Sequence, residues 1–169
     1  AGIAPIWQSA FTDFLRAEAA LLGLASGNPK ALLEAGMRKS IDKVIGYPAT
    51  VSVTVPAANV PSTTRIDNFV NVIGNAYDLA ANNNERLTVI AKEFYVALWG
   101  NGVDAYNLYR RTGRPDNFQF TKVPNPGVFV RSFLYPSVHV NLNQNARQKP
   151  GTGVETPVFW DNNPANIFR

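Results

Sequence analysis

The amino-acid sequence predicts a mainly α-helical protein whose last third is an irregular coil. Apolar residues between positions 9 and 111 recur every three or four residues, which is the spacing of one face of a helix. Seven of the twelve prolines fall after residue 113, where that spacing is lost. Aromatic residues are frequent in the same region, and they normally pack against a folded surface. We therefore divide the 169 residues into a helical part, 1–113, and an irregular segment, 114–169, that wraps over it.

The first two predicted helices, residues 9–23 and 29–46, form a hairpin because a short connection joins them. Both helices begin and end at residue types that are typical of helix ends. These are polar N-caps, a proline at the first helical position of the second helix, and glycines after the last turns. These residues are Ser9, Gly23, Asn28, Pro29 and Gly46. Such hairpins are the building units of tetratricopeptide-type arrays.

Prolines interrupt the helical spacing between residues 47 and 64. The alternating run Val51–Val55 within this stretch fits either an edge strand or an extended loop. Three further helices are then predicted, over residues 65–82, 85–99 and 102–111. The last asparagine of the Asn82–Asn84 loop is placed to cap the helix that follows it.

Composition argues against several classes of function. The sequence has no cysteine and one histidine, so a thiolate site or a histidine-rich metal site is excluded, and no cofactor is expected. No apolar run reaches the roughly 18 residues that a membrane helix needs. Residues 110–169 carry 8 Lys+Arg against 3 Asp+Glu. These basic residues are scattered, so nucleic acid is not an expected partner.

Catalysis is not expected, because the carboxylates are few and lie mostly on predicted helix surfaces. Paired carboxylates could still hydrolyse a glycoside, but the sequence does not show which of them meet in space. Glu18 is an exception to the surface pattern, since it falls on or beside the apolar face of the first helix. It is either a rim residue turned toward water or a partly buried carboxylate paired with Arg110 or Arg111. Both alternatives give Glu18 a structural role.

The three tryptophans are the natural candidates for a carbohydrate site. Flat rings stack on sugar faces, while amides and guanidinium groups bond the hydroxyls. Trp99 ends a helical face and is expected in the core, and Trp160 is expected to anchor the carboxyl-terminal coil. Trp7 precedes the first helix and is the tryptophan least committed to packing, so it is the ligand-binding candidate. Binding there is expected to depend on aromatic contacts rather than on charge.

A resemblance to a known family rests on the stretch Phe94 to Pro115, which reads FYVALWGNGVDAYNLYRRTGRP. It resembles the carboxyl-terminal part of SusD/RagB-type nutrient-binding outer-membrane lipoproteins of Bacteroidota. In that family a helix ending in a Tyr-Ile-Ala-Leu-Phe-like run is followed by Asn-Gly, an acidic-Ala-aromatic step and Arg-Arg-Thr-Gly-x-Pro. The motif residues singled out here are Asn101, Gly102, Arg110, Arg111, Thr112 and Gly113. Flanking segments agree as well, so the resemblance spans about Phe11 to Asp161.

The resemblance implies a SusD-like fold, in which tetratricopeptide-like hairpins pack with the long Pro-, Asn- and aromatic-rich coil. One departure is that Arg131-Ser132 stands where the family often has two arginines. Family members are also much longer, and the amino-terminal half with their lipidated cysteine has no counterpart here. We therefore expect residues 1–169 to be the carboxyl-terminal part of a longer protein, partnered by the missing amino-terminal half.

By the same resemblance, the parent protein is expected at the cell surface in the outer membrane. It would capture glycans or other nutrients and pass them to a SusC-like TonB-dependent transporter. No ligand residue is carried over from the family, and the motif residues, including Arg110 and Arg111, are expected to form a scaffold. Two other classes stay open: a helical-repeat protein-interaction module without ligand binding, and a carbohydrate-active enzyme.

Overall fold

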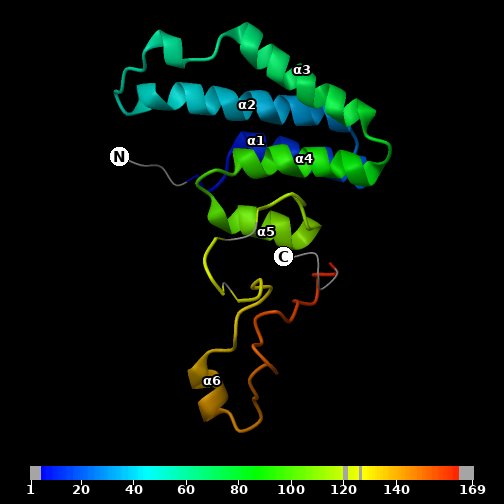
Figure 1. Ribbon diagram of the computed structural model, residues 1–169, viewed down its shortest axis with the longest axis vertical. Coiled ribbons are helices and arrows are strands. Elements are labelled where there is room, and N and C mark those ends of the chain that lie inside the picture. Colours follow the sequence, from blue (N-terminus) through cyan, green and yellow to red (C-terminus); the bar gives the residue numbers. More distant parts are fainter. Residues whose placement is uncertain (1–4, 120–121, 126, 164–169) are drawn as a thin grey trace. The chain divides into compact units, whose positions relative to one another are not determined.

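The computed structural model describes residues 5–119, 122–125 and 127–163. All regular structure in these ranges is helical, without a strand, which confirms the predicted fold class (Figure 1). Among the described helices, none is long and apolar enough to cross a membrane. The chain divides into two compact units, Ala1–Tyr106 and Asn107–Arg169.

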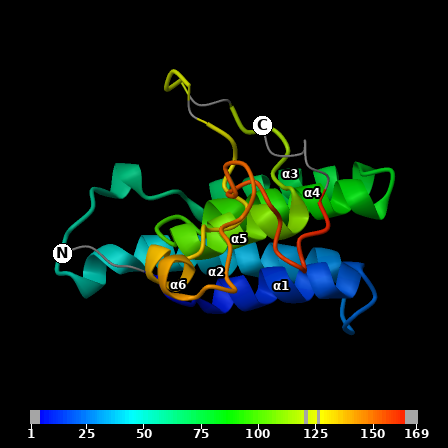
Figure 2. The same cartoon turned by 90° about the horizontal axis from the view of Figure 1, so that it is seen from below.

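The amino-terminal unit is built from four α-helices and one short 3₁₀ helix. They are α1 (Ser9–Leu21), α2 (Pro29–Thr50), η1 (Ala57–Asn59), α3 (Thr63–Leu79) and α4 (Asn83–Ala97). Helix α1 packs against α2 and α4, and α3 packs against the same two helices (Figures 1 and 2). The predicted hairpin is therefore present as α1 and α2. Between α2 and η1 the run Val51–Val55 is a loop, not a strand.

Phenylalanine rings pack together in the core of this unit. Phe14 is fully buried and lies on Phe94, with ring planes 11° apart and centroids 5.2 Å apart. Phe11 is also fully buried, and its ring centroid lies 5.9 Å from that of Phe94. A Cβ atom at Gly36 would lie 3.1 Å from the Phe14 ring, so α2 approaches α1 closely at this position. Close packing of this kind makes the core sensitive to small changes of volume.

Helix α1 begins differently from the prediction. Ser9 is its first helical residue, and the N-cap is Gln8, which makes no side-chain capping bond. The Gln8 carbonyl already accepts a hydrogen bond from the Phe11 N–H at 3.0 Å, so the chain has entered the helix before Ser9 could cap it. The end of α1 is as predicted, since Gly23 has φ +72° and donates its N–H to the Ala20 carbonyl.

Helix α2 begins as predicted but ends later. The Asn28 side chain caps it by accepting a hydrogen bond from the Ala31 N–H at 3.1 Å. Gly46 was expected to end this helix, but the helix continues through Pro48 to Thr50. A proline near the last turn removes only one backbone donor, so the remaining bonds still hold the turn.

The connection between α3 and α4 also differs from the prediction. Helix α3 ends before the asparagines, because the backbone of Ala80 is extended. Asn82, not Asn84, caps α4, and its side chain accepts a hydrogen bond from the Glu85 N–H at 3.0 Å. Glu85 in turn accepts a hydrogen bond from the Ala81 N–H at 2.8 Å. Glu85 stands three residues after Asn82, so the two form a reciprocal cap that Asn84 could not form.

The carboxyl-terminal unit contains the last residues of α5 (Gly102–Thr112), which crosses the boundary between the units, and all of α6 (Ser137–Leu142). Helix α5 lies where it was predicted. Helix α6 was missed, because six residues after a proline are too short to show helical spacing. The other described residues after α5 form turns, bends and coil. Residues 120–121, 126 and 164–169 of the predicted coil lie outside the described residues.

Candidate functional site

The motif residues Asn101 and Gly102 form the start of α5. Asn101 is buried, and its side-chain oxygen accepts a hydrogen bond from the Asp104 N–H at 3.1 Å. Its side-chain amide donates to the Asp104 carboxylate at 2.6 Å and to the Ile6 carbonyl at 3.2 Å. The bonds with Asp104 cap the helix, and the bond to Ile6 holds the segment before α1. Asn101 therefore positions the chain that carries Trp7.

Two glycines beside Asn101 provide a matched test of this turn. Gly100 has φ +89°, and a Cβ atom on it would lie 3.2 Å from Cδ of Pro5. Nothing lies within 4 Å of a Cβ atom on Gly102. We expect Gly100→Ala to lower the free energy of unfolding by about 1 kcal/mol or more, because alanine rarely adopts this backbone, and Gly102→Ala to be nearly neutral. Denaturant unfolding measures both, and equal losses would contradict the expectation.

The motif residues Thr112 and Gly113 end the same helix. Gly113 has φ +67°, and its N–H donates to the Tyr109 carbonyl at 2.7 Å. The Thr112 hydroxyl donates to the Leu108 carbonyl at 2.7 Å, and it accepts a hydrogen bond from the Arg114 N–H at 3.1 Å. These bonds satisfy backbone groups that a helix end leaves without helical partners.

Arg110 is buried in the carboxyl-terminal unit, whereas Arg111 is exposed. The Arg110 guanidinium donates to the Arg131 carbonyl at 2.8 Å and lies 4.6 Å from the centre of the Trp160 ring. The Asn163 side-chain amide donates to the Arg110 carbonyl at 2.5 Å. Trp160, which is 40% exposed, thus packs on an α5 side chain by a cation–π contact.

Asp161 holds the Arg131 side chain with both carboxylate oxygens. Arg131 Nε donates to Oδ2 at 2.8 Å, and Nη2 lies 2.8 Å from Oδ1. Both side chains are buried, with 5% and 0% of their surface exposed. The hydrogen bond from Arg131 is the largest cause that holds the pKa of Asp161 below its usual value of 3.8. This network is already satisfied by internal bonds, so it is a structural core and not a ligand site.

Glu18 lies on the buried side of α1, with 7% of its surface exposed, so it is not turned toward water. Its pairing with Arg110 or Arg111 stays a prediction. Within the described ranges there is no group of three or more His, Asp or Glu residues that could hold a metal ion.

Trp7 is 55% exposed, and contacts with Thr12 and Phe11 hold its ring in place. The indole Nε1 donates to the Thr12 hydroxyl at 3.1 Å, and the ring stands at 86° to Phe11 with centroids 5.8 Å apart. Trp7 lines a pocket of about 240 Å³ together with Lys39 and Lys43 of α2. The structure therefore leaves Trp7 available to a ligand.

Trp99 is 92% exposed, so the expectation that it lies in the core is wrong. Leu98, the residue before it, fills the core, while the Trp99 side chain lies on the surface. Trp99 lines a second pocket, of about 370 Å³, together with Tyr47. Gln8 and Lys43 line both this pocket and that of Trp7, so the two pockets meet.

The two pockets form one continuous surface, which we call the Trp7–Trp99 groove. Three parts of the chain line it: the segment before and at the start of α1, one face of α2, and the end of α4. The lining residues are Pro5, Trp7, Gln8, Ser9, Ala10, Lys39, Ser40, Lys43, Val44, Tyr47, Val96, Ala97, Trp99 and Gly100. The groove thus combines aromatic rings with side-chain amide, hydroxyl and amine groups.

Two lysines line the groove, and a buried carboxylate of α1 balances the charge of one of them. Asp13 is 5% exposed, and its Oδ2 lies 2.5 Å from Nζ of Lys39. The ion pair fixes the Lys39 amine beside the first pocket. Lys43 is exposed and lies one turn further along the same face of α2. The lining therefore carries a positive charge at the point where the two pockets meet.

Trp7, the residue that the sequence predicts to contact a ligand, lines this groove, and its role in binding stays a prediction. The groove also contains Lys39, Lys43, Tyr47 and Trp99, which the sequence did not indicate as ligand-contacting residues. Lys39, Lys43 and Tyr47 are spaced by four residues, so they share one face of a helix that continues past Gly46. The expectation that Gly46 ends the helix hid the place of Tyr47 on this face, whereas Lys39 and Lys43 lie within the predicted helix.

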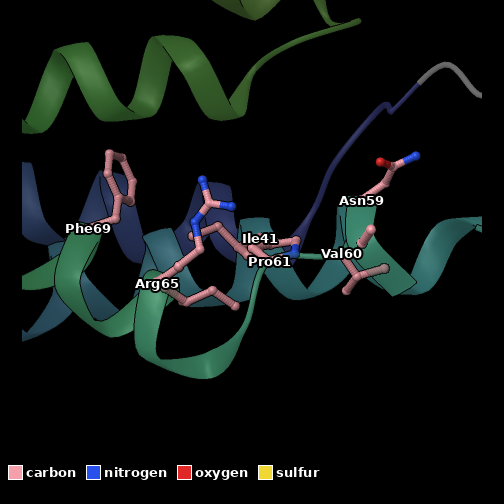
Figure 3. A pocket seen from close by; sticks show the side chains of 8 residues that line it. Ile41, Asn59, Val60, Pro61, Arg65 and Phe69 are labelled. Carbon is pink, nitrogen blue, oxygen red and sulfur yellow. The ribbon is translucent and has the colours of Figure 1, made fainter. Parts of the chain in front are cut away.

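A separate pocket of about 450 Å³ lies between α2, η1 and α3 (Figure 3). Its lining includes aliphatic side chains such as Ile41 and Val60 and a single aromatic ring, Phe69. In Figure 3 Phe69 and Asn59 mark its two ends, with Arg65 between them. With one ring, this pocket offers a sugar less stacking surface than the Trp7–Trp99 groove does.

Comparison with known proteins relates the chain to a lipoprotein family. The SusD-like family, described as "Susd and RagB outer membrane lipoprotein", matches residues 4–154. A solved structure described as "Bacteroidetes AC2a SusD-like" shares the fold, with a TM-score of 0.59 and 22% sequence identity. That match covers 80% of this chain and 25% of the other, so the chain spans about a quarter of the length of that relative. No curated protein matches the sequence.

Proposed function

The chain belongs to the SusD-like family of outer-membrane lipoproteins, and we propose that its parent protein captures glycans or other nutrients at the cell surface. Proteins of this family are generally non-catalytic binding proteins. In this proposal the parent is lipid-anchored in the outer membrane and passes its ligand to a SusC-like TonB-dependent transporter. The present chain contributes a scaffold and one ligand-contacting surface, and the remaining part of the parent protein contributes the rest.

The observation that carries this proposal is the Trp7–Trp99 groove. Trp7 and Trp99 are 55% and 92% exposed, and both line a groove that also holds amide and amine donors. Exposed rings beside hydrogen-bonding side chains suit the apolar faces and hydroxyl edges of sugars.

The motif residues support the scaffold part of the proposal. The bonds of Asn101 and Thr112 cap the two ends of α5, and Arg110 is held by contacts within the carboxyl-terminal unit. Groups that are already bonded internally are poorly placed to exchange partners with a ligand. We propose the same scaffold role for Gly102, Arg111 and Gly113.

Isothermal titration of this chain against a panel of oligosaccharides and peptides tests nutrient capture. We expect binding with Kd on the order of micromolar to millimolar, because a few contacts to exposed rings leave little surplus free energy after the cost of association. We also expect the ligand to be recovered unchanged from the same mixtures. Absence of binding to every member of the panel would contradict capture, and release of cleavage products would favour an enzyme instead.

One observation favours a second function, a helical-repeat module that binds a protein partner. The pocket between α2 and α3 is mostly aliphatic, which suits an apolar side chain of another protein better than a sugar. Under this function oligosaccharide titrations show no binding to the chain, and Phe69→Ala weakens co-purification with a SusC-like transporter.

A further inference from the structure

We infer that the Trp7–Trp99 groove binds an acidic oligosaccharide, that is, a chain of sugars in which at least one carries a carboxylate. This inference rests on the proposed function and specifies its ligand class and its site. The arrangement of rings and the position of one positive charge both lead to it.

The rings indicate a ligand longer than one sugar. Trp7 and Trp99 belong to different pockets, of about 240 and 370 Å³, which meet at Gln8 and Lys43. The α2 residues that line the groove run from Lys39 to Tyr47, and at 1.5 Å per residue this face extends for roughly 12 Å. A ligand that reaches both tryptophans must therefore be an oligosaccharide and not a single sugar ring.

The lysines indicate that the ligand is acidic. Lys39 is paired with the buried Asp13 carboxylate at 2.5 Å, so its charge is balanced within the protein. An ammonium group has three donors, so Lys39 can still donate to a sugar hydroxyl. Lys43 adds a positive charge between the two rings, at the position that any spanning ligand must cross. A sugar carboxylate there gains a charge-assisted hydrogen bond, which a neutral sugar cannot form.

This inference refines the expectation of binding by aromatic contacts alone. Stacking on the rings supplies the main attraction, and Lys43 selects between acidic and neutral ligands of the same shape. Because Lys43 is exposed, its contribution is screened by salt. Binding should therefore weaken moderately as the salt concentration rises, but not as steeply as binding to a polyphosphate chain does.

The test is isothermal titration of this chain with trigalacturonate and with its methyl-esterified, uncharged counterpart, at low and at high salt. We expect Trp99→Ala and Trp7→Ala each to weaken trigalacturonate binding by about tenfold or more, as loss of a central ring does. We expect Lys43→Gln to weaken it by about two- to fivefold and to abolish the preference over the methyl ester. Two matched controls lie outside the groove, Phe69→Ala for a ring and Lys92→Gln for a charge. Melting temperatures of all variants separate lost contacts from lost folding.

Each other outcome overturns the inference in a distinct way. Equal binding of trigalacturonate and its ester would exclude the acidic ligand class while leaving nutrient capture intact. Loss of binding in Phe69→Ala but not in the tryptophan variants would move the site to the other pocket. A dimer that Trp99→Ala dissociates, with no effect on titrations, would make the groove an interface between copies. Failure to bind any member of the wider panel would count against nutrient capture itself.

Discussion

Replacement of Asp161 by asparagine is expected to destabilise the carboxyl-terminal unit by about 3–5 kcal/mol, because it leaves the buried Arg131 guanidinium without its counter-ion. Both side chains are buried, with 5% and 0% of their surface exposed, and two contacts of 2.8 Å join them. The backbone N–H groups of Arg131 and Ser132 both donate to the Val154 carbonyl, so they report on this region. Their hydrogen exchange should accelerate by roughly two to three orders of magnitude or more.

An exposed ion pair provides the control for this variant. Arg38 and Asp67 lie 2.7 Å apart, but their side chains are 44% and 45% exposed. Asp67→Asn removes the same kind of charge from the amino-terminal unit, and it should cost less than about 1 kcal/mol. If Asp161→Asn left the Arg131 and Ser132 amides as protected as in the wild type, the ion pair would not support this unit.

The same residue gives the carboxyl-terminal unit a defined dependence on pH. The hydrogen bond from Arg131 holds the pKa of Asp161 below its usual value of 3.8. The Asp161 carboxylate therefore takes up a proton less readily in the folded state than in the unfolded state. The stabilising contribution of Asp161 is therefore complete above about pH 3.8 and is lost as the pH falls toward the lowered pKa. In Asp161→Asn this acid-dependent loss of protection should disappear. In the amino-terminal unit the pKa of Glu93 changes in the opposite direction, because burial raises it above its usual value of 4.5.

Replacement of Phe14 by alanine is expected to lower the free energy of unfolding by about 3–5 kcal/mol, because it removes a fully buried ring and leaves a cavity. The lost contacts include the stack on Phe94, with centroids 5.2 Å apart. Gly36 also lies against the Phe14 ring, and a glycine offers no side chain that could fill the space. Denaturant unfolding followed by circular dichroism at a helical wavelength measures the loss.

Leu79→Ala is the control for the core variant. Leu79 is 85% exposed at the end of α3 in the same unit, so its truncation should change the free energy of unfolding by no more than about 0.5 kcal/mol. A loss for Phe14→Ala as small as that for Leu79→Ala would mean that the stacked rings are not the centre of the core.

The features that the sequence by itself determined are those that depend on residues close together along the chain. Helical class, the order of the helices and the position of α5 follow from apolar spacing over a few turns. The caps at Asn28 and Gly23 follow from the preferences of single residues at helix ends. The end of the second helix was wrong because the helix continues through both Gly46 and Pro48, two residues that locally favour a helix end.

Only the tertiary structure decided which residues form the groove and the buried network. Arg131 and Asp161 are thirty residues apart, and no spacing rule relates them. Trp99 continues an apolar face in the sequence, yet its side chain is exposed, and its neighbour Leu98 fills the core instead. Trp7 and Trp99 share one groove because α2 packs against both α1 and α4 and contributes lining residues to both pockets. Contacts of this kind depend on how helices pack, and packing is a property of the whole unit that local patterns do not contain.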